Sequence, residues 1–290
     1  MKIKNILKRI SWVIPDPLYL HLKYCLRTGK RLNLKNPTTY TEKLQWLKLY
    51  DRRPEYTDLV DKYEVKTIVA EKLGEEHVIP LLGVWDKSED IPFGELPDQF
   101  VLKCTHDSGG LQICKDKSNF DFQKAKKKLD EVLKVNYYWS SREWPYKNVK
   151  PRVIAEKYME DADTGETRDY KFFTFNGEPK VMYIATGRGT GETYGDFFDM
   201  DFNHLELDLD HTNAPKCPEK PACFEEMKKA AAILAQGIPQ VRVDFYEING
   251  QYYFGEMTFF HCGGFVNFKP EHWNKQFGDW VPECEKTENV

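Results

Sequence analysis

Residues 241–260 read VRVDFYEINGQYYFGEMTFF, two runs of β-branched and aromatic residues on either side of an Asn-Gly pair. Such runs predict strands, and the Asn-Gly pair between them predicts a hairpin turn. Arg242, Asp244 and Glu256 interrupt the apolar pattern. These charges belong either to a solvated face or to a functional site, and the register of the two strands decides between the two interpretations.

Two turn lengths are open for this hairpin, and the shorter one separates the charges. In a two-residue turn at Asn249-Gly250, Asp244 lies opposite Gly255. Glu256 then lies on the other face, because successive side chains of a strand alternate. Without a compensating bulge, this turn gives the two carboxylates no shared site.

A three-residue loop ending in Gly250 as a G1 bulge shifts the register and brings the charges together. The residues that then share one face are Arg242, Asp244, Glu256 and Thr258. The two carboxylates become diagonal neighbours with Cα atoms about 7–8 Å apart, close enough to hold one hard cation. We therefore predict Asp244 and Glu256 as Mg²⁺ ligands, with a solvated face and an Arg242–Glu256 pair as the alternative.

The composition is that of a folded protein. The chain has 290 residues, 41% hydrophobic and 14% aromatic, enough for a sizeable core and one to three subdomains. The net charge of −4 gives no reason to expect nucleic-acid binding. The 7 cysteines show no C-x-x-C pair and no zinc-type spacing, and their odd number without a signal peptide predicts a reducing cytoplasm. No apolar run reaches the roughly 20 residues that a transmembrane helix needs.

Basic residues are concentrated near the N-terminus. Residues 1–35 contain nine Lys and Arg against a single acid, Asp16. The apolar residues of the first segment fall on one helical face: Ile3, Ile6, Leu7 and Ile10. We expect this segment either to contact the inner face of a membrane peripherally or to pack on its own domain with a solvated basic rim.

The order of the predicted elements indicates an α+β protein with antiparallel sheets. The predicted helices include 39–51, 56–74, 119–139 and 224–238, and the predicted strands fall within 77–86, 98–116, 152–160, 168–188 and 241–260. Asn176-Gly177 predicts a second hairpin within residues 168–188. The stretch from residue 189 to Pro221 is predicted to be rich in loops. We divide the chain into a helical region 1–76, a lid-type α+β subdomain 77–150 and a C-terminal subdomain 151–290.

Two Gly-rich segments are candidates for anion-binding loops. The turn THDSGG at 105–110 follows Lys103, and backbone N–H groups freed by its glycines can close over phosphates. An ordinary hairpin turn is the alternative. The segment TGRGTGETYG at 186–195 fails as a dinucleotide motif, because residue 192 is Glu and no helix follows, although Arg188 can still meet an anion.

Two further positions concern a nucleotide. Asp169 is the only acid in a largely aromatic strand, where a buried carboxylate needs donors such as ribose hydroxyls or a pair with Arg168 or Lys171. The strand RVIAEKYMED at 152–161 leads into a charged hinge and can offer backbone groups to a flat base, but its periodicity does not distinguish this from an ordinary strand.

Six segments in one order resemble the TupA-like ATP-grasp family, which is associated with bacterial surface-polysaccharide, teichuronopeptide and capsule biosynthesis. They are NPTTYTEKLQWLKLYD, VDKYEVK, LPDQFVLKCTHDSGG, VIAEKYMED, RDYKFFTFNGEPK and RVDFYEINGQYYFGEMTF, and they extend over nearly the whole chain. The resemblance implies an ATP-grasp fold, with a nucleotide held between two α+β subdomains and an extra helical N-terminal region.

The resemblance also implies ATP and Mg²⁺ and a role for each site residue. Lys62 and Lys103 would contact phosphates, His106, Ser108, Gly109 and Gly110 would belong to the lid, Glu156 and Tyr158 to the adenine hinge, and Asp169 would bind the ribose. Asp244 and Glu256 would bind Mg²⁺, with Arg242 and Arg188 as catalytic residues near the transferred phosphate. Thr258 departs from the family pattern, which has a metal-binding Asn at that position, and THDSGG and FFHCGGF also differ from the expected forms.

The activity implied is an ADP-forming carboxylate–amine ligase with an acyl-phosphate intermediate. The expected substrates are an amino acid and a uronic acid or a lipid-linked glycan, with no nucleic acid as partner. A sugar kinase of the same fold and a glycosyltransferase with a D-x-D motif at Asp199–Asp201 are the alternatives, and a non-catalytic binding module is a third.

Overall fold

The central helices form where apolar stripes follow good capping residues. α3 (Tyr40–Tyr50) begins with a capping box, in which the side chains of Thr39 and Glu42 each accept from the other's backbone N–H. The stripe of residues 56–74 is divided between α4 (Tyr56–Val60) and α5 (Glu64–Leu73). Asp61 makes the break, because its carboxylate accepts from the backbone N–H groups of the next helix's first turn. The break leaves Lys62 outside both helices.

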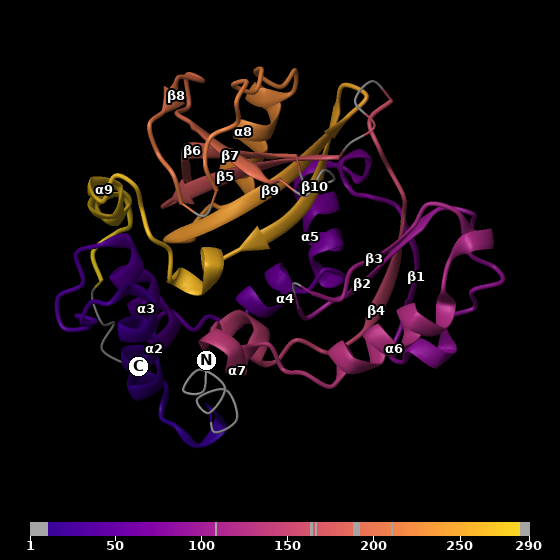
Figure 1. The fold of residues 1–290 in the computed structure, drawn as a ribbon, viewed down its shortest axis with the longest axis horizontal. Coiled ribbons are helices and arrows are strands. Elements are labelled where there is room, and N and C mark those ends of the chain that lie inside the picture. The colour runs from indigo at the N-terminus through magenta and orange to yellow at the C-terminus, as the bar shows by residue number, and fades with distance from the viewer. Residues whose placement is uncertain are drawn as a thin grey trace.

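The computed structural model describes residues 11–107, 109–162, 165, 167–187, 192–209 and 211–284. The predicted amphipathic segment at residues 3–10 therefore lies outside the described part of the chain, as do Ser108 and Arg188. The remaining helices are α2 (Asp16–Thr28), α6 (Phe122–Leu133), α7 (Tyr138–Ser141), α8 (Phe224–Leu234) and α9 (His272–Trp280). Two sheets form separate layers, and α2, α3 and α9 gather at the end of the molecule opposite α6 (Figure 1).

The smaller sheet is antiparallel throughout, with the strand order β1-β4-β2-β3. Its strands are β1 (Leu81–Trp85), β4 (Val153–Lys157), β2 (Phe100–Cys104) and β3 (Gln112–Cys114). α6 packs on one face, where Leu129 joins a buried cluster with Phe100 and Leu102. The alternate residues Val101 and Lys103 therefore face the other way, toward the larger sheet. β4 lies beyond the predicted subdomain boundary at residue 150, and the boundaries themselves stay a prediction.

The larger sheet is also antiparallel, with the strand order β10-β9-β5-β6-β7-β8. Its strands are β5 (Arg168–Phe175), β6 (Glu178–Thr186), β7 (Tyr194–Phe198), β8 (His204–Leu205), β9 (Gln240–Ile248) and β10 (Gln251–Thr258). The hairpin predicted at Asn176-Gly177 is confirmed, with positive φ at both residues. β7 and β8 correct the prediction of a loop-rich stretch. Gly195 weakened the strand signal of β7, yet glycine is required there, since a Cβ would lie 2.4 Å from the Tyr183 ring.

The turn of the β9–β10 hairpin differs from the one that we expected to unite the charges. It is a two-residue turn, with φ of 52° at Asn249 and 74° at Gly250, and Ile248 pairs with Gln251. The three-residue loop prediction is wrong, because positive φ at both central positions is the two-residue turn that Asn-Gly favours.

A bulge farther along β10 restores the shared face. The register shifts between Phe254 and Glu256, so that Glu256 pairs with Asp244 and Thr258 with Arg242. Gly255 supplies the extra residue, and a Cβ there would lie 3.0 Å from the Asp244 carbonyl oxygen. The two carboxylates are therefore directly opposite each other rather than diagonal.

Candidate active site

The charged residues of β9 line a cleft and are not solvated. Val243 and Phe245 point to the face covered by α8 and are fully buried. Arg242 and Asp244 alternate with them on the other face and are only 6% and 1% exposed. The alternation of the strand thus puts one face into the core and the charged face into the space between the sheets.

Asp244 is held by two cations. Arg242 donates Nε to Oδ1 and Nη2 to Oδ2, each over 2.7 Å, in a bidentate pair. Lys171 Nζ lies 2.5 Å from Oδ2. Burial alone would raise the pKa of Asp244, but Arg242 and Lys171 hold it below its usual value. The carboxylate is therefore charged at neutral pH.

Glu256 is the open member of the carboxylate pair. Its Oε1 accepts from Arg242 Nη2 and from Thr258 Oγ1, each over 3.1 Å. Its side chain is 39% exposed, whereas that of Asp244 is 1% exposed. Arg242 Nη2 also donates to Thr258 Oγ1 over 3.0 Å. The Arg242–Glu256 pair that we gave as the alternative is present, but on a buried face.

These ligands fit a cation shared with a substrate rather than a closed metal site. Among the described residues, no group of three or more His, Cys, Asp or Glu could hold a metal ion. Two carboxylates completed by phosphate oxygens and water are a usual Mg²⁺ environment. Asp244 and Glu256 fit that role, with Arg242 paired to both carboxylates and Lys171 to Asp244.

Lys171, which we predicted only as a pair for Asp169, is a further functional candidate. Its Nζ lies 3.4 Å from Asp169 Oδ1 as well as beside Asp244, and the side chain is 7% exposed. The register explains this position, because Lys171 pairs with Asp244 across β5 and β9. Alternation along β5 carries a signal, since Asp169 and Lys171 share a face with each other and with the charged residues of β9.

The side chain of Glu156 on β4 forms ion pairs with two lysines, one on β2 and one on α5. Lys103 Nζ lies 2.5 Å from its Oε2, and Lys66 Nζ lies 2.6 Å from its Oε1. Burial would raise the pKa of Glu156, but Lys103 and Lys66 hold it below its usual value. Glu156 thus fixes Lys103 at the cleft, and we interpret the hinge role predicted for this residue as one for its backbone and neighbours.

The Gly-rich turn closes over one end of the cleft. Lys62 Nζ donates to the backbone carbonyl of Asp107, and Asp107 Oδ2 accepts from the Gly109 N–H over 2.9 Å. Gly110 lines the cleft, and a Cβ there would lie 2.8 Å from Cys104 Sγ, so that only glycine fits. His106 points elsewhere, with Nε2 near the carbonyl of Val132 on α6. Lys62 and Gly110 line the same end of the cleft, whereas His106 does not join them.

The cleft has an apolar end of about 500 Å³. Its walls come from both sheets and include Val101, Ile113, Met159, Ala185, Tyr158, Tyr246 and Ile248. Leu111 and Ile113 are 50% and 49% exposed because they face this space. An apolar slot of this size between two sheets suits a flat aromatic base.

The polar end of the cleft measures about 380 Å³ and adjoins the apolar end. The two ends share Lys103, Leu111, Asp169 and Tyr246. The charged lining comprises Lys62, Lys103, Lys171 and Arg242, together with Asp107, Asp169, Asp244 and Glu256. Cations therefore lie between the apolar slot and the carboxylate pair.

Tyr183, His211, His261 and Cys262 line the same polar end. His261 belongs to η6 (His261–Gly264), and its Nδ1 lies 2.5 Å from Arg242 Nη1. A guanidinium only donates, so Nδ1 is the acceptor and the ring proton lies on Nε2. Nε2 lies 3.8 Å from Cys262 Sγ at the same end of the cleft.

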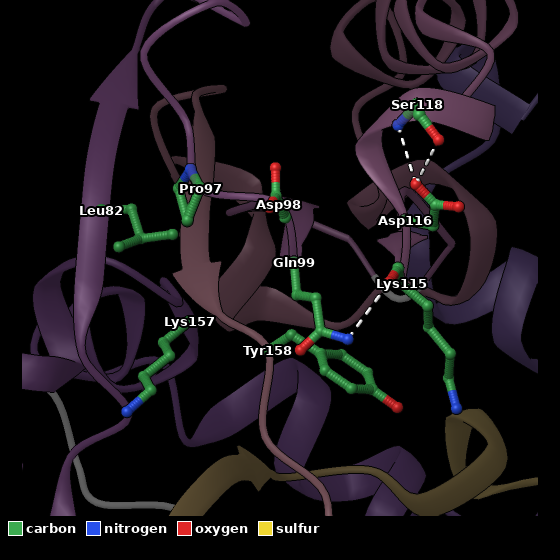
Figure 2. Close-up of a pocket in the computed structure, with 9 residues that line it drawn as sticks. All are labelled: Leu82, Pro97, Asp98, Gln99, Lys115, Asp116, Ser118, Lys157 and Tyr158. Atoms are coloured by element: carbon green, nitrogen blue, oxygen red, sulfur yellow. Dashed lines mark hydrogen bonds between the residues drawn. The ribbon is translucent and has the colours of Figure 1, made fainter.

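A larger open depression of about 900 Å³ borders the apolar end but lacks its chemistry. Figure 2 shows its lining residues, among them Leu82 of β1, Gln99 and Tyr158. Gln99 Nε2 donates to the Lys115 carbonyl there, and Tyr158 also lines the apolar slot. The depression has no buried charge pair, so we place the site in the cleft. Asp199 of the D-x-D segment instead accepts from Asn203 and Asp201 in a local turn.

The family model described as TupA-like ATPgrasp matches residues 42–282, which include every residue that lines the two ends of the cleft. The chain belongs to this family. Its ATP-grasp architecture is the pair of α+β layers around the cleft. A comparison with curated proteins finds no significant match.

Solved structures similar to this TupA-like ATPgrasp protein include two D-alanine–D-alanine ligases. The one from Bacillus anthracis, complexed with ATP, is 18% identical with a TM-score of 0.38, covering 69% of this chain and 53% of that one. The one from Helicobacter pylori is 15% identical with a TM-score of 0.42, covering 84% and 69%. The ATP-grasp ligase PsnB with minimal precursor, Mg and ADP is 10% identical with a TM-score of 0.39, covering 75% and 57%. The chain thus spans about half of the Bacillus anthracis ligase.

Proposed function

We propose that this protein is an ATP- and Mg²⁺-dependent carboxylate–amine ligase that forms ADP. The proposed substrates belong to a surface polysaccharide or its precursor, with an amino acid joined to a uronic acid. Membership of the TupA-like ATPgrasp family supports this proposal. The reaction would take place in the cytoplasm.

One observation carries the proposal: the order of chemistry along the cleft. An apolar slot leads to Lys103 and Lys62, and these lead to the carboxylate pair Asp244 and Glu256. A nucleoside triphosphate has the same order of an apolar base, an anionic chain and a metal-bound terminal phosphate. We propose that Asp169, which is shared by both ends, accepts hydrogen bonds from the ribose.

Each cation has a defined task in this scheme. Lys103, fixed by Glu156, and Lys62, at the Gly-rich turn, neutralise phosphate oxygens. Mg²⁺ bound by Asp244 and Glu256 would supply Lewis-acid stabilisation of the transferred phosphoryl group. Arg242 keeps its charge because Asp244 and Glu256 raise its pKa despite burial, and it faces the polar end where charge develops.

The bonds that change are few. A carboxylate oxygen attacks the γ-phosphorus, the bond to the β-phosphate oxygen breaks, and ADP leaves. The amine nitrogen then attacks the acyl carbon, and inorganic phosphate leaves with one oxygen of the original carboxylate. The amine proton is released to water. His261, which lines the polar end, would contact the acceptor substrate.

Product analysis tests the proposal. The purified protein is incubated with ATP and Mg²⁺ across panels of amino acids and uronic acids, and free phosphate, ADP and new amides are measured. We expect phosphate release only when a carboxylate and an amine are both present. Formation of a phosphosugar without phosphate release would instead identify a kinase and overturn the ligase proposal.

A further inference from the structure

The outward face of α2 departs from the usual pattern of a surface helix. Leu18, Leu22 and Leu26 are spaced four residues apart and are 53%, 41% and 44% exposed. Trp12 and Val13, just before the helix, are 69% and 57% exposed. We call these five residues the α2 ridge. Because the outward face of a surface helix is normally polar, three exposed leucines along one helical face indicate a contact surface.

The packing of the other face fixes the ridge outward. Tyr19, Leu20 and Tyr24 are buried in a small core with Leu32 and Phe265. Tyr19 also donates its hydroxyl to the carbonyl of Ser140 over 2.8 Å. These contacts hold α2 in one orientation, so the exposure of the ridge is a property of the folded protein.

The segment that contains the ridge carries more positive than negative charge. Asp16 is the only acid in residues 12–41, and its carboxylate is engaged by Arg52 and Arg142, each at 2.7 Å. The cations of this segment are Lys23, Arg27, Lys30, Arg31 and Lys35.

Most of these cations are available to an outside partner. Lys30 pairs with Glu271 at 2.5 Å, and both side chains are largely exposed. Arg27, Arg31 and Lys35 are exposed and form no ion pair with any residue in the described part of the chain. A partner that covers the ridge would therefore meet a surplus of positive charge.

We propose that the α2 ridge docks on an anionic lipid surface. The leucines and Trp12 would enter the headgroup region, and Arg27, Arg31 and Lys35 would face lipid phosphates. An apolar face bordered by Lys and Arg is the pattern of helices that lie in the membrane interface. None of the helices in the described residues is long and apolar enough to cross a membrane, so the contact is one of lying on the surface. This docking through α2 differs from the membrane contact through residues 1–10 that the sequence predicts as one alternative.

The placement of α2 relates the docking surface to the cleft. Its buried face packs on Phe265, which directly follows η6, and His261 and Cys262 of η6 line the polar end of the cleft. Docking would therefore bring the acceptor end of the site close to molecules carried by the lipid. The docking itself does not depend on which reaction the cleft performs.

Vesicle flotation of the full-length protein, without nucleotide, tests the proposal. We expect at least about tenfold more protein to float with vesicles containing phosphatidylglycerol than with phosphatidylcholine alone. Added salt should reduce the difference, because it screens the cations. Equal binding to both vesicles, or none to either, would overturn the proposal.

Two double variants of exposed residues separate the ridge from the charge. Leu18→Glu with Leu22→Glu, and Arg27→Glu with Arg31→Glu, should each lower the floated fraction by about tenfold or more. The matched controls are Ile233→Glu on α8, where the side chain is 44% exposed, and Lys127→Glu with Lys128→Glu on α6. The controls should bind as the wild type does, with unfolding midpoints showing that every variant is folded. An equal loss in the controls would contradict the proposal, as would a lipid-free dimer that Leu18→Glu with Leu22→Glu dissociates.

Discussion

Glu156 on β4 and Asp244 on β9 resemble each other closely. Each is a buried carboxylate between two cations, Lys66 and Lys103 in one case, Arg242 and Lys171 in the other. In both, the cations lower a pKa that burial alone would raise. Burial and neighbouring cations therefore do not distinguish the role of Glu156 from that of Asp244.

The cross-strand neighbours make the difference. Asp244 lies opposite Glu256, a second carboxylate whose side chain is 39% exposed in the cleft. Glu156 lies opposite Leu81 on one side and Val101 on the other. Two acids that face each other can share a metal with a substrate, whereas a lone acid between lysines can only position them. We therefore propose that the ion pairs of Asp244 belong to a metal site, whereas those of Glu156 position lysines.

Removing the charge of Asp244 should have the largest effect. Asp244→Asn should reduce ATP turnover by about 10²–10³-fold, as expected when a preorganised electrostatic group is lost from an active site. Phosphate release with Mg²⁺ measures this. Asp199→Asn, an acid in the turn before β8, is the matched control and should keep turnover within about twofold. Equal activity of Asp244→Asn and wild type would remove Asp244 from the site.

Glu156→Gln should act first on stability. It leaves Lys66 and Lys103 close together without their carboxylate, and breaking such a buried pair costs about 3–5 kcal/mol of unfolding free energy. Urea unfolding measures the loss. The Lys66→Met, Glu156→Gln double variant removes one of the stranded cations and should recover part of it. An unchanged midpoint in Glu156→Gln would mean that the ion pairs of Glu156 with Lys66 and Lys103 do not stabilise the fold.

The ion pairs of Glu156 and Asp244 also predict that the stability of the fold depends on pH. Because the pKa of Glu156 and of Asp244 is lowered in the folded protein, their contribution is complete above the unfolded values of about 4. It is lost as the pH falls through the lower folded values. Urea midpoints measured from pH 6 downward should therefore fall in acid, and less steeply in Glu156→Gln. The same slope in variant and wild type would contradict the role of Glu156.

Lys171→Met tests the residue between Asp169 and Asp244. Its removal should lower Mg²⁺-dependent turnover by about 10–100-fold, the range seen when a group that orients metal ligands is lost. Lys171→Arg should recover part of the activity, since it keeps the charge. Full activity in Lys171→Met would show that the lysine balances the charge of Asp169 and Asp244 without orienting the metal ligands.

Thr258→Asn should give the smallest change, and in the opposite direction. Thr258 lies beside Glu256, and an amide oxygen there would add a ligand for a hard cation. The Mg²⁺ concentration at half-maximal turnover should fall about threefold, or by about 0.6 kcal/mol in binding free energy. A rise would mean that the Thr258 hydroxyl, with its hydrogen bonds to Arg242 and Glu256, contributes more than the added ligand.

Much of the site could be predicted from the sequence, because strand alternation and turn chemistry are local properties. Strand alternation and the Asn-Gly turn predict the hairpin, and the charges on one face of β9 follow from the period of two. The bulge at Gly255 was not predictable from the turn alone, because it depends on the fit of β10 against Asp244. The ion pairs of Glu156 and the Lys171–Asp244 pair were not predictable from the strand pattern, because their partners come from other strands and from α5. Ser108 and Arg188 stay predictions, since both lie outside the described residues.

Calorimetric titration of ADP with and without Mg²⁺ tests most directly the central contrast between Asp244, as a metal ligand, and Glu156, as a residue that positions lysines. The ratio of the two affinities isolates the metal site, even where a variant weakens nucleotide binding itself. We predict that Mg²⁺ tightens ADP binding by about tenfold or more in the wild type and in Glu156→Gln, and has no such effect in Asp244→Asn. A Mg²⁺ effect that survives in Asp244→Asn, or that disappears in Glu156→Gln, would contradict the account.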